Sequence, residues 1–265
     1  MQLLTSTANP RIKELRALRQ RKAREETGLC LVEGIRAVGE AFEAGAEVAA
    51  LYYAPDLLTS DYARGLIQSQ EQRGLGVYPV AADLFRTLAD KDNPQGLIAL
   101  VRRPQTALAE LTPANFGWGV ALVSPQDPGN IGTILRTLDG VGAAGMILLD
   151  ESADPSHPAA IRASMGTLFW HPVAQAGWEE FAAWARRYAY HLYGTSAHGA
   201  TDYTNMTHYE RPAILLLGSE REGLADQQQA ICEQLISLPM RGRATSLNLA
   251  VAAGVMLYEM QRKLE

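Results

Sequence analysis

The stretch SPQDPGNIGTILRTLDGVGAAGMILLD, residues 124–150, decides the fold of this chain. An apolar run, VALVS at 120–124, ends where this stretch begins. A second apolar run, MILLD at 146–150, ends the stretch. Between them, apolar residues recur at helical spacing from Asn130 to about Val141. Continuous apolar strands joined through a helix are typical of a buried parallel sheet. The stretch therefore predicts strand, helix and strand in an α/β domain.

The same stretch contains GVGAAG at 140–145, which has the G-x-G-x-x-G spacing of a dinucleotide-binding fingerprint. In that fingerprint the glycines follow a strand and open a helix, so that the pyrophosphate lies at the helix N-terminus. Here the predicted helix precedes the glycines, and its C-terminal dipole repels phosphate. A left-handed helix cap at Gly140 or Gly142 is the better interpretation. A nicotinamide oxidoreductase is therefore the weakest function hypothesis.

Composition describes a globular chain. Its 265 residues are 47% hydrophobic and 20% charged, enough for one large domain or two ordinary ones. Two cysteines provide neither a disulfide framework nor a zinc site, and the five histidines have no ligand-like spacing, so no metal is expected. No signal peptide and no apolar run of membrane-spanning length is recognised, so we expect a cytoplasmic protein that does not contact a membrane.

The order of predicted elements indicates two α/β domains. We expect an N-terminal domain at 1–105, a proline-interrupted linker at 106–118 and a second domain at 119–265. Strands are expected at 29–34, 48–55, 76–80, 95–103, 120–124, 146–150, 191–197, 213–220 and 235–240, and helices at 10–26, 35–45, 61–72, 82–89, 130–141, 158–170, 178–190, 225–234 and from 245 to the end.

Charge is distributed unevenly. The formal net charge is −5, and the excess of acidic residues lies after residue 105. Basic residues instead crowd into RIKELRALRQRKAR at 11–24, where Glu14 is the only acid. Such a run is usually a solvated helix face, and it can also be a phosphate-binding surface.

Three separated stretches carry a family resemblance. Asn130, Gly132 and Arg136 form N-x-G-x-x-x-R, LLLGSEREGL follows at 215–224, and LISLPMRGRATSLNLAVAAGVMLYE follows at 235–259. Together they closely resemble the three motifs of the SpoU/TrmH class of the SPOUT superfamily, which are S-adenosylmethionine-dependent RNA ribose 2′-O-methyltransferases. Upstream, LCLVEGIRAVGEAFEAGAEVAALYYAP is similar to the L30e-like RNA substrate-binding domain that precedes many catalytic domains of this class.

The resemblance implies a fold and an assembly. The N-terminal domain would be L30e-like, and the C-terminal domain would be a SPOUT α/β domain with a parallel sheet and a deep trefoil knot. General folding rules would not have predicted a knot. The resemblance also implies S-adenosylmethionine as cofactor and a homodimer whose active sites form near the interface.

Five residues match the catalytic positions of the class: Arg136, Asn130, Glu220, Ser246 and Asn248. Taken alone, Asn130 could cap a helix, Thr245 or Ser246 could cap the last helix, and Glu220 could be an exposed loop acid. By resemblance, Asn130 helps shape the RNA site near Arg136, Glu220 contributes to the active site and to holding the knot loops, and Ser246 and Asn248 make polar contacts at the reacting centre. Because arginine stays protonated at neutral pH, we favour a role for Arg136 in gripping an RNA phosphate and orienting the hydroxyl. Its role as the base, proposed within the class, stays open.

The cofactor would be held mainly by backbone groups, at the matching positions Gly218, Leu238, Met240 and Leu247. In the basic segment we expect Arg19, Arg21 and Lys22 to contact RNA, because an acidic catalytic domain needs cationic help to approach a polyanion. Structured ribosomal RNA is the expected substrate. A transfer-RNA methyltransferase of the same class and a catalytically silent RNA-binding relative are the alternatives.

Overall fold

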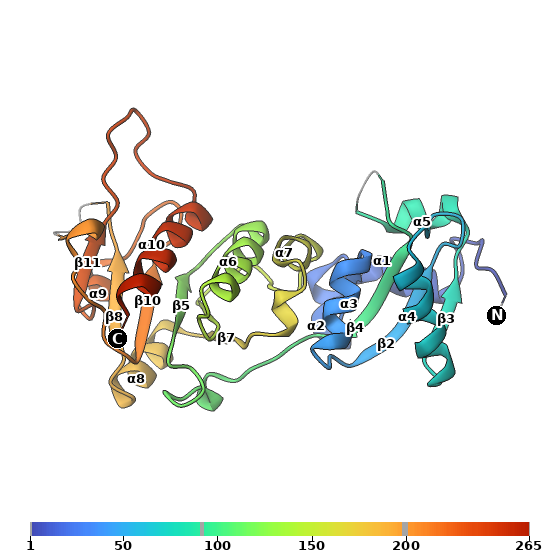
Figure 1. The fold of residues 1–265 in the computed structure, drawn as a ribbon, viewed down its shortest axis with the longest axis horizontal. Helices are drawn as coiled ribbons and strands as arrows, with labels where there is room; N and C mark the ends of the chain where they lie inside the picture. The colour runs from blue at the N-terminus through green and yellow to red at the C-terminus, as the bar shows by residue number, and fades with distance from the viewer. Residues whose placement is uncertain (1, 91–92, 198–200, 265) are drawn as a thin grey trace. The chain divides into compact units, whose positions relative to one another are not determined.

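A computed structural model of the chain describes residues 2–90, 93–197 and 201–264 (Figure 1). The chain divides into two compact units. Unit 1 comprises residues 1–104 together with 156–170, and unit 2 comprises residues 105–155 together with 171–265. Within the described residues no helix has the length and apolar character needed to cross a membrane.

Unit 1 is a four-stranded mixed sheet with helices packed on it. The sheet order is β1-β4-β2-β3; β4 is antiparallel to both β1 and β2, and β2 is parallel to β3. Its elements up to residue 104 are α1 Pro10–Ala17, α2 Arg21–Thr27, β1 Leu29–Glu33, α3 Ile35–Glu43, β2 Val48–Tyr53, α4 Asp61–Gln72, β3 Gly76–Pro79, α5 Ala82–Leu88 and β4 Leu97–Arg102.

The basic segment forms two helices, where one long helix was predicted. The break lies between Ala17 and Arg21. It is stabilised by Arg24, which is buried and donates from Nη1 to the carbonyl oxygens of Leu18 and Arg19, each at 2.9 Å. A buried guanidinium therefore satisfies carbonyls that the interrupted helix leaves without partners.

Residues 156–170 pack with unit 1, although the predicted boundary assigns them to the second domain. They form α7 (Pro158–Ser164) and a short 3₁₀ turn, η2 (Thr167–Phe169), where one helix was predicted. The helix ends because Met165 and Gly166 are left-handed; a Cβ on Gly166 would lie 2.5 Å from the Cβ of Glu40. Trp170 also donates from Nε1 to Glu40 Oε2 at 3.0 Å, which attaches the segment to α3.

Unit 2 is built on a seven-stranded sheet in which every strand pair is parallel, which confirms the predicted parallel α/β fold. The sheet order is β7-β6-β5-β10-β8-β11-β9. Its elements are η1 Leu108–Glu110, β5 Trp118–Val123, α6 Pro128–Gly140, β6 Met146–Leu149, β7 Val173–Ala176, α8 Trp178–Arg187, β8 His191–Thr195, β9 Thr201–Asp202, η3 Tyr203–Asn205, β10 Ala213–Leu217, α9 Asp226–Gln229, β11 Gln234–Ser237 and α10 Leu249–Lys263.

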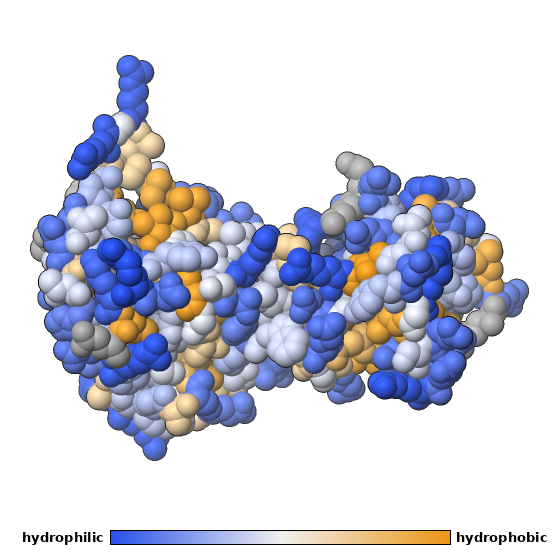
Figure 2. All heavy atoms as spheres, in the orientation of Figure 1, coloured by the Kyte–Doolittle hydropathy of each residue, from blue (hydrophilic) through white to orange (hydrophobic). Residues whose placement is uncertain are grey.

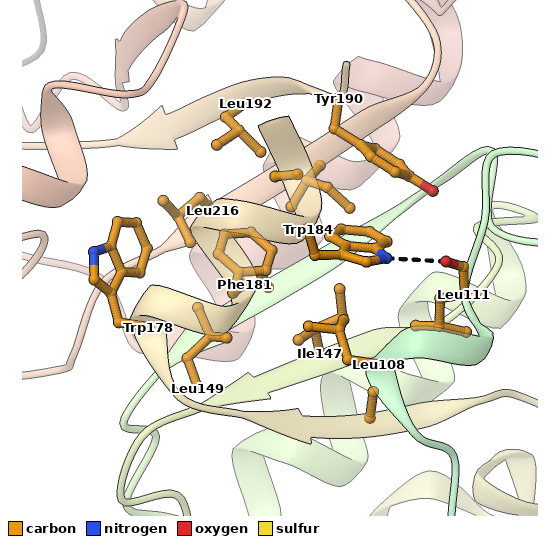
Figure 3. Close-up of a cluster of buried hydrophobic side chains, with 14 of the residues drawn as sticks. Leu108, Leu111, Ile147, Leu149, Trp178, Phe181, Trp184, Tyr190, Leu192 and Leu216 are labelled. Atoms are coloured by element: carbon orange, nitrogen blue, oxygen red, sulfur yellow. Dashed lines mark hydrogen bonds between the residues drawn. The ribbon is translucent and has the colours of Figure 1, made fainter. Parts of the chain in front are cut away.

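The expected linker at 106–118 packs into the core of unit 2. Its side chains Leu108, Leu111 and Phe116 are buried in one cluster with aromatic residues of α8 (Figure 3). Trp184 donates from Nε1 to the carbonyl oxygen of Leu111 at 2.9 Å, and Tyr190 donates from its hydroxyl to that of Phe116 at 2.6 Å. The prolines interrupt the periodicity of this segment, but its apolar residues still make it part of the domain.

The structure places GVGAAG after a helix and before a strand, as the sequence predicts. This segment joins the end of α6 to the start of β6, and Gly142 takes the left-handed conformation with φ +70°. A Cβ on Gly145 would approach the carbonyl oxygen of Pro172 to 2.4 Å, so close backbone packing explains that glycine. The interpretation as a helix exit turn is confirmed, and the phosphate-binding interpretation is excluded by geometry.

Candidate active site

Three of the predicted catalytic residues meet at the carboxyl edge of the unit 2 sheet. Strands β5 and β10 are parallel neighbours, so the segments that follow them lie side by side. Asn130 donates from Nδ2 to Glu220 Oε1 at 3.2 Å, and Asn248 donates from Nδ2 to Asn130 Oδ1 at 3.0 Å. We call this hydrogen-bonded chain, Glu220–Asn130–Asn248, the polar triad.

The helix caps differ from those expected. Asp127, and not Asn130, caps α6, accepting from the backbone N–H of Gly129 at 2.7 Å. Asn130 lies inside the helix and is 8% exposed, so its amide serves the polar triad. Asn248, and not Thr245 or Ser246, caps α10; its Oδ1 accepts from the backbone N–H groups of Ala250 and Val251.

The helices α6 and α10 pack against each other with their N-termini together. The Asn130–Asn248 contact joins their first turns, and a Cβ on Gly254 would lie 3.9 Å from Thr137 one or two turns later. The positive ends of both helix dipoles therefore lie at the polar triad. Such an end favours anions, including the phosphate groups of RNA. The site thus combines a carboxylate, two amides and an electropositive backbone.

Sequence reasoning missed Gln126, which organises the loops around this site. Its Nε2 donates to the carbonyl oxygens of Ser124 and Glu151, both at 2.9 Å, and its backbone N–H donates to Glu220 Oε2 at 3.4 Å. One side chain therefore ties together the loops after β5 and β6, and its backbone reaches the loop after β10. A single glutamine in a polar turn gives no pattern from which this role could be predicted.

Arg136 and Ser246 do not join the polar triad. Arg136 is exposed on α6 and has no ion pair with any described residue. It lies six residues after Asn130, which on a helix is about 9 Å further along and on another face. Ser246 lies in the stretch 239–248, which is exposed at every position and projects from unit 2 between β11 and α10 (Figure 1).

Of the four predicted cofactor residues, Gly218 and Leu238 directly follow strands at this sheet edge, whereas Met240 and Leu247 lie in the projecting 239–248 stretch. Gly218 follows β10 and is buried; a Cβ there would lie 2.1 Å from the carbonyl carbon of Gly223, because residues 219–223 turn back over it. Leu238 follows β11 and is half-buried. Met240 and Leu247 are 37% and 40% exposed.

These residues are compatible with S-adenosylmethionine. Exposed apolar side chains beside a polar cluster can cover a flat adenine, and loop backbone groups can bind its edge. A metal cofactor has no such support, because the described residues contain no group of histidine, cysteine or acidic side chains arranged to hold an ion.

The three basic side chains predicted to bind RNA differ in the contacts that they make within unit 1. Arg19 donates from Nη2 to the carbonyl oxygens of Leu88 and Ala89, at 3.1 and 2.9 Å, and so caps the C-terminus of α5. Arg21 pairs with Glu25 at 2.7 Å, and Lys22 lies 3.8 Å from its nearest acid. Arg21 and Lys22 stay well exposed, whereas the guanidinium of Arg19 already has a structural role.

Models of known domain families match both parts of this chain. The model of the SpoU rRNA Methylase family matches residues 118–258, which include the polar triad and Arg136. The model of the MRM3-like substrate binding domain matches residues 9–99, which lie in unit 1. The predicted division between an RNA substrate-binding region and a methylase region therefore has a counterpart in known domains.

Relatives extend the match over nearly the whole chain. A 23S rRNA (uridine(2479)-2′-O)-methyltransferase of Streptomyces viridochromogenes is 34% identical over 97% of this chain and 91% of its own length. The guanosine(2553)-2′-O-methyltransferase RlmP of Bacillus subtilis, also a 23S rRNA enzyme, is 27% identical over 98% of this chain and 100% of its own.

Solved structures agree in fold. An AdoMet-bound rRNA methyltransferase from Sinorhizobium meliloti superimposes with a TM-score of 0.90 at 35% identity, covering 98% of this chain and 97% of that chain. AdoMet is S-adenosylmethionine, the cofactor predicted from the sequence. The predicted family is confirmed: this chain belongs to the SpoU rRNA Methylase family.

Proposed function

We propose that this protein transfers a methyl group from S-adenosylmethionine to a ribose 2′-hydroxyl of ribosomal RNA. The observation that carries the proposal is the polar triad at the joined N-termini of α6 and α10. Relatives of nearly full coverage are named as 23S rRNA 2′-O-methyltransferases, which favours ribosomal over transfer RNA. A cytoplasmic location, with access to ribosomal RNA, is part of the proposal.

The chemistry is an in-line displacement at an activated methyl group, which S-adenosylmethionine supplies when bound. The protein must orient the hydroxyl, help remove its proton and exclude water. The helix N-termini would bind the phosphate next to the target ribose. Asn130 and Asn248 hold the Glu220 carboxylate in a fixed orientation. Arg136, whose guanidinium stays charged, would grip a phosphate and orient the hydroxyl.

We also propose a homodimer, with the deep trefoil knot of the class around the cofactor loops. One face of α10 supports the dimer: Val251, Val255 and Tyr258, at helical spacing, are 52%, 37% and 58% exposed. Figure 2 shows apolar residues gathered beside the base of the 239–248 loop. An apolar face of this kind is typical of a protein–protein interface. Pairing there would bring Arg136, which does not reach the polar triad of its own chain, close to the site of the second copy.

Substituting Val255→Asp should therefore dissociate the dimer, because an uncompensated carboxylate in an apolar interface is costly. Analytical ultracentrifugation of the wild type is expected to give twice the mass of one chain, and the variant should give the mass of one chain. Gln227→Asp on the exposed face of α9 adds the same charge and should leave the dimer intact. A wild type that sediments as a single chain would refute the proposed assembly.

Substituting Gln126→Glu should slow catalysis while the fold survives. The glutamate has the same size but cannot donate to the carbonyls of Ser124 and Glu151, and it adds a charge near Glu220. We expect kcat for methyl transfer to fall by about 10- to 100-fold, since small displacements of positioning groups have effects of this size. The matched variant Gln227→Glu should keep the wild-type kcat. A Gln126→Glu enzyme within twofold of wild type would show that Gln126 does not organise the site.

Isothermal calorimetry and a transfer assay test the proposed function itself. S-adenosylmethionine should bind and NADH should not, and tritium from the labelled methyl group should appear in ribosomal RNA. Binding without transfer would favour the catalytically silent relative. Transfer to transfer RNA alone would favour the other alternative. Absence of S-adenosylmethionine binding would refute both the cofactor and the activity.

A further inference from the structure

Unit 1 contains an open groove of about 520 Å³ that the proposed reaction does not explain. It lies between α3 and the start of α4, which are on the same face of the unit 1 sheet (Figure 1). Its size is in the range of sites that bind one small organic ligand. The side chains that determine its chemistry are Arg36, Glu40, Glu43, Ser60, Tyr62 and Gln95.

Two glycines leave room for the key side chains of this groove. The hydroxyl of Tyr62 lies so near Gly39 that a Cβ there would be 2.7 Å from it. Gly34 has φ +100° and leaves room for Gln95, whose Oε1 accepts from the backbone N–H of Ile35 at 3.1 Å. Tyr62 is 53% exposed, so about half of its surface faces solvent. The groove therefore presents an open aromatic surface.

The described side chains of the groove disfavour a phosphate group inside it. Among the described residues that line the groove, Arg36 is the one cation; it lies 3.7 Å from Glu40, while Glu43 adds a second carboxylate. Burial, together with the Glu43 carboxylate to which the hydroxyl donates, raises the pKa of Tyr62, so the ring stays neutral at physiological pH. A flat, uncharged ligand with hydrogen-bond donors suits this combination of ring and carboxylate.

We infer that the groove binds one unstacked base of the RNA substrate, and that this base carries an exocyclic amino group. The inference rests on the proposed function. The base would stack on Tyr62, and its amino group would donate to the Glu43 carboxylate, while Gln95 Nε2 would donate to a ring acceptor. Adenine, cytosine and guanine satisfy this pattern, and uracil does not. The groove would thus help select the RNA that unit 2 modifies.

The test measures binding of in vitro transcribed 23S rRNA without S-adenosylmethionine, so that it is independent of methyl transfer. Tyr62→Ala should raise the Kd by about 10-fold, which is typical for loss of one base stack. Tyr62→Phe keeps the ring and should stay within twofold of wild type. Tyr203→Ala, a tyrosine of unit 2, is the matched control and should also stay within twofold.

Zero-length ultraviolet crosslinking of the wild type keeps the test valid if the alanine variant does not fold. Mass spectrometry should identify Tyr62 joined to, or directly beside, an adenosine, cytidine or guanosine. A Kd for Tyr62→Ala within twofold of wild type would overturn the inference, as would crosslinks in unit 1 that avoid this groove or that join it to uridine. Wild-type protein that binds this RNA but transfers no methyl group would refute the proposed function alone.

Discussion

Replacing Arg136 by alanine is expected to reduce kcat for RNA methylation by about 100- to 10,000-fold, the range for groups that position or stabilise the reacting atoms. The side chain is exposed on α6 and has no ion pair with a described residue, so its removal should not cost folding stability. The melting temperature and the affinity for S-adenosylmethionine should therefore match the wild type. A guanidinium can align an RNA phosphate through two hydrogen bonds, and water cannot replace it.

Two further variants test whether the loss of activity is specific to the guanidinium group of Arg136. Arg136→Lys keeps the charge but loses the planar fork that binds phosphate with two hydrogen bonds, so we expect intermediate activity. Arg186→Ala removes an exposed arginine from α8 and should retain full activity. Steady-state kinetics with labelled S-adenosylmethionine and ribosomal RNA measures all three. Activity of Arg136→Ala within threefold of wild type would remove this residue from the proposed mechanism.

Replacing Trp184 by alanine is expected to lower the free energy of unfolding of unit 2 by about 3–5 kcal/mol, the usual cost of deleting a buried aromatic side chain. Trp184 is 6% exposed and stacks on Tyr190 with ring centroids 4.4 Å apart (Figure 3). The substitution also leaves the carbonyl oxygen of Leu111 without its donor. This effect arises because the 106–118 segment is part of the core.

Urea denaturation followed by tryptophan fluorescence measures this loss, since Trp118 and Trp178 remain as reporters in unit 2. Trp184→Phe keeps an aromatic ring and loses the N–H donor, so it should cost about 1–3 kcal/mol. Trp170→Phe, at an exposed position of unit 1, is the control for unit 2 stability. A loss below 1 kcal/mol for Trp184→Ala would show that the 106–118 segment is only a connection.

Much of the fold could be predicted because its strands are continuous apolar runs. The order of strand and helix around 124–150 identified a parallel sheet and rejected the glycine fingerprint by direction alone. The strand Val173–Ala176 was missed, since its residues VAQA form no continuous apolar run and include only one β-branched side chain. The packing of 156–170 on unit 1 depends on contacts with α3 that no local pattern encodes.

The candidate site could be predicted only in part. The motifs identified Asn130, Glu220 and Asn248, but their contacts span 90 and 118 residues and depend on β5 and β10 being neighbours. The sequence alone does not show that β5 and β10 are neighbours in the sheet. Taken alone, Asn130 suggested a helix cap, whereas the structure buries its amide against a carboxylate. Gln126 was missed because its partners are backbone carbonyls, which every residue possesses.

The position of the transferred methyl group tests the central claim most directly. Unmodified 23S rRNA, made by transcription, would be incubated with the enzyme and tritium-labelled S-adenosylmethionine and then hydrolysed with alkali. Because a 2′-O-methyl group blocks cleavage of the adjacent phosphodiester, we predict that the label appears in alkali-resistant dinucleotides with the wild type and not with Arg136→Ala. Label in mononucleotides would mean methylation of a base, and it would contradict the proposed ribose 2′-O-methyltransferase activity, as would the absence of label.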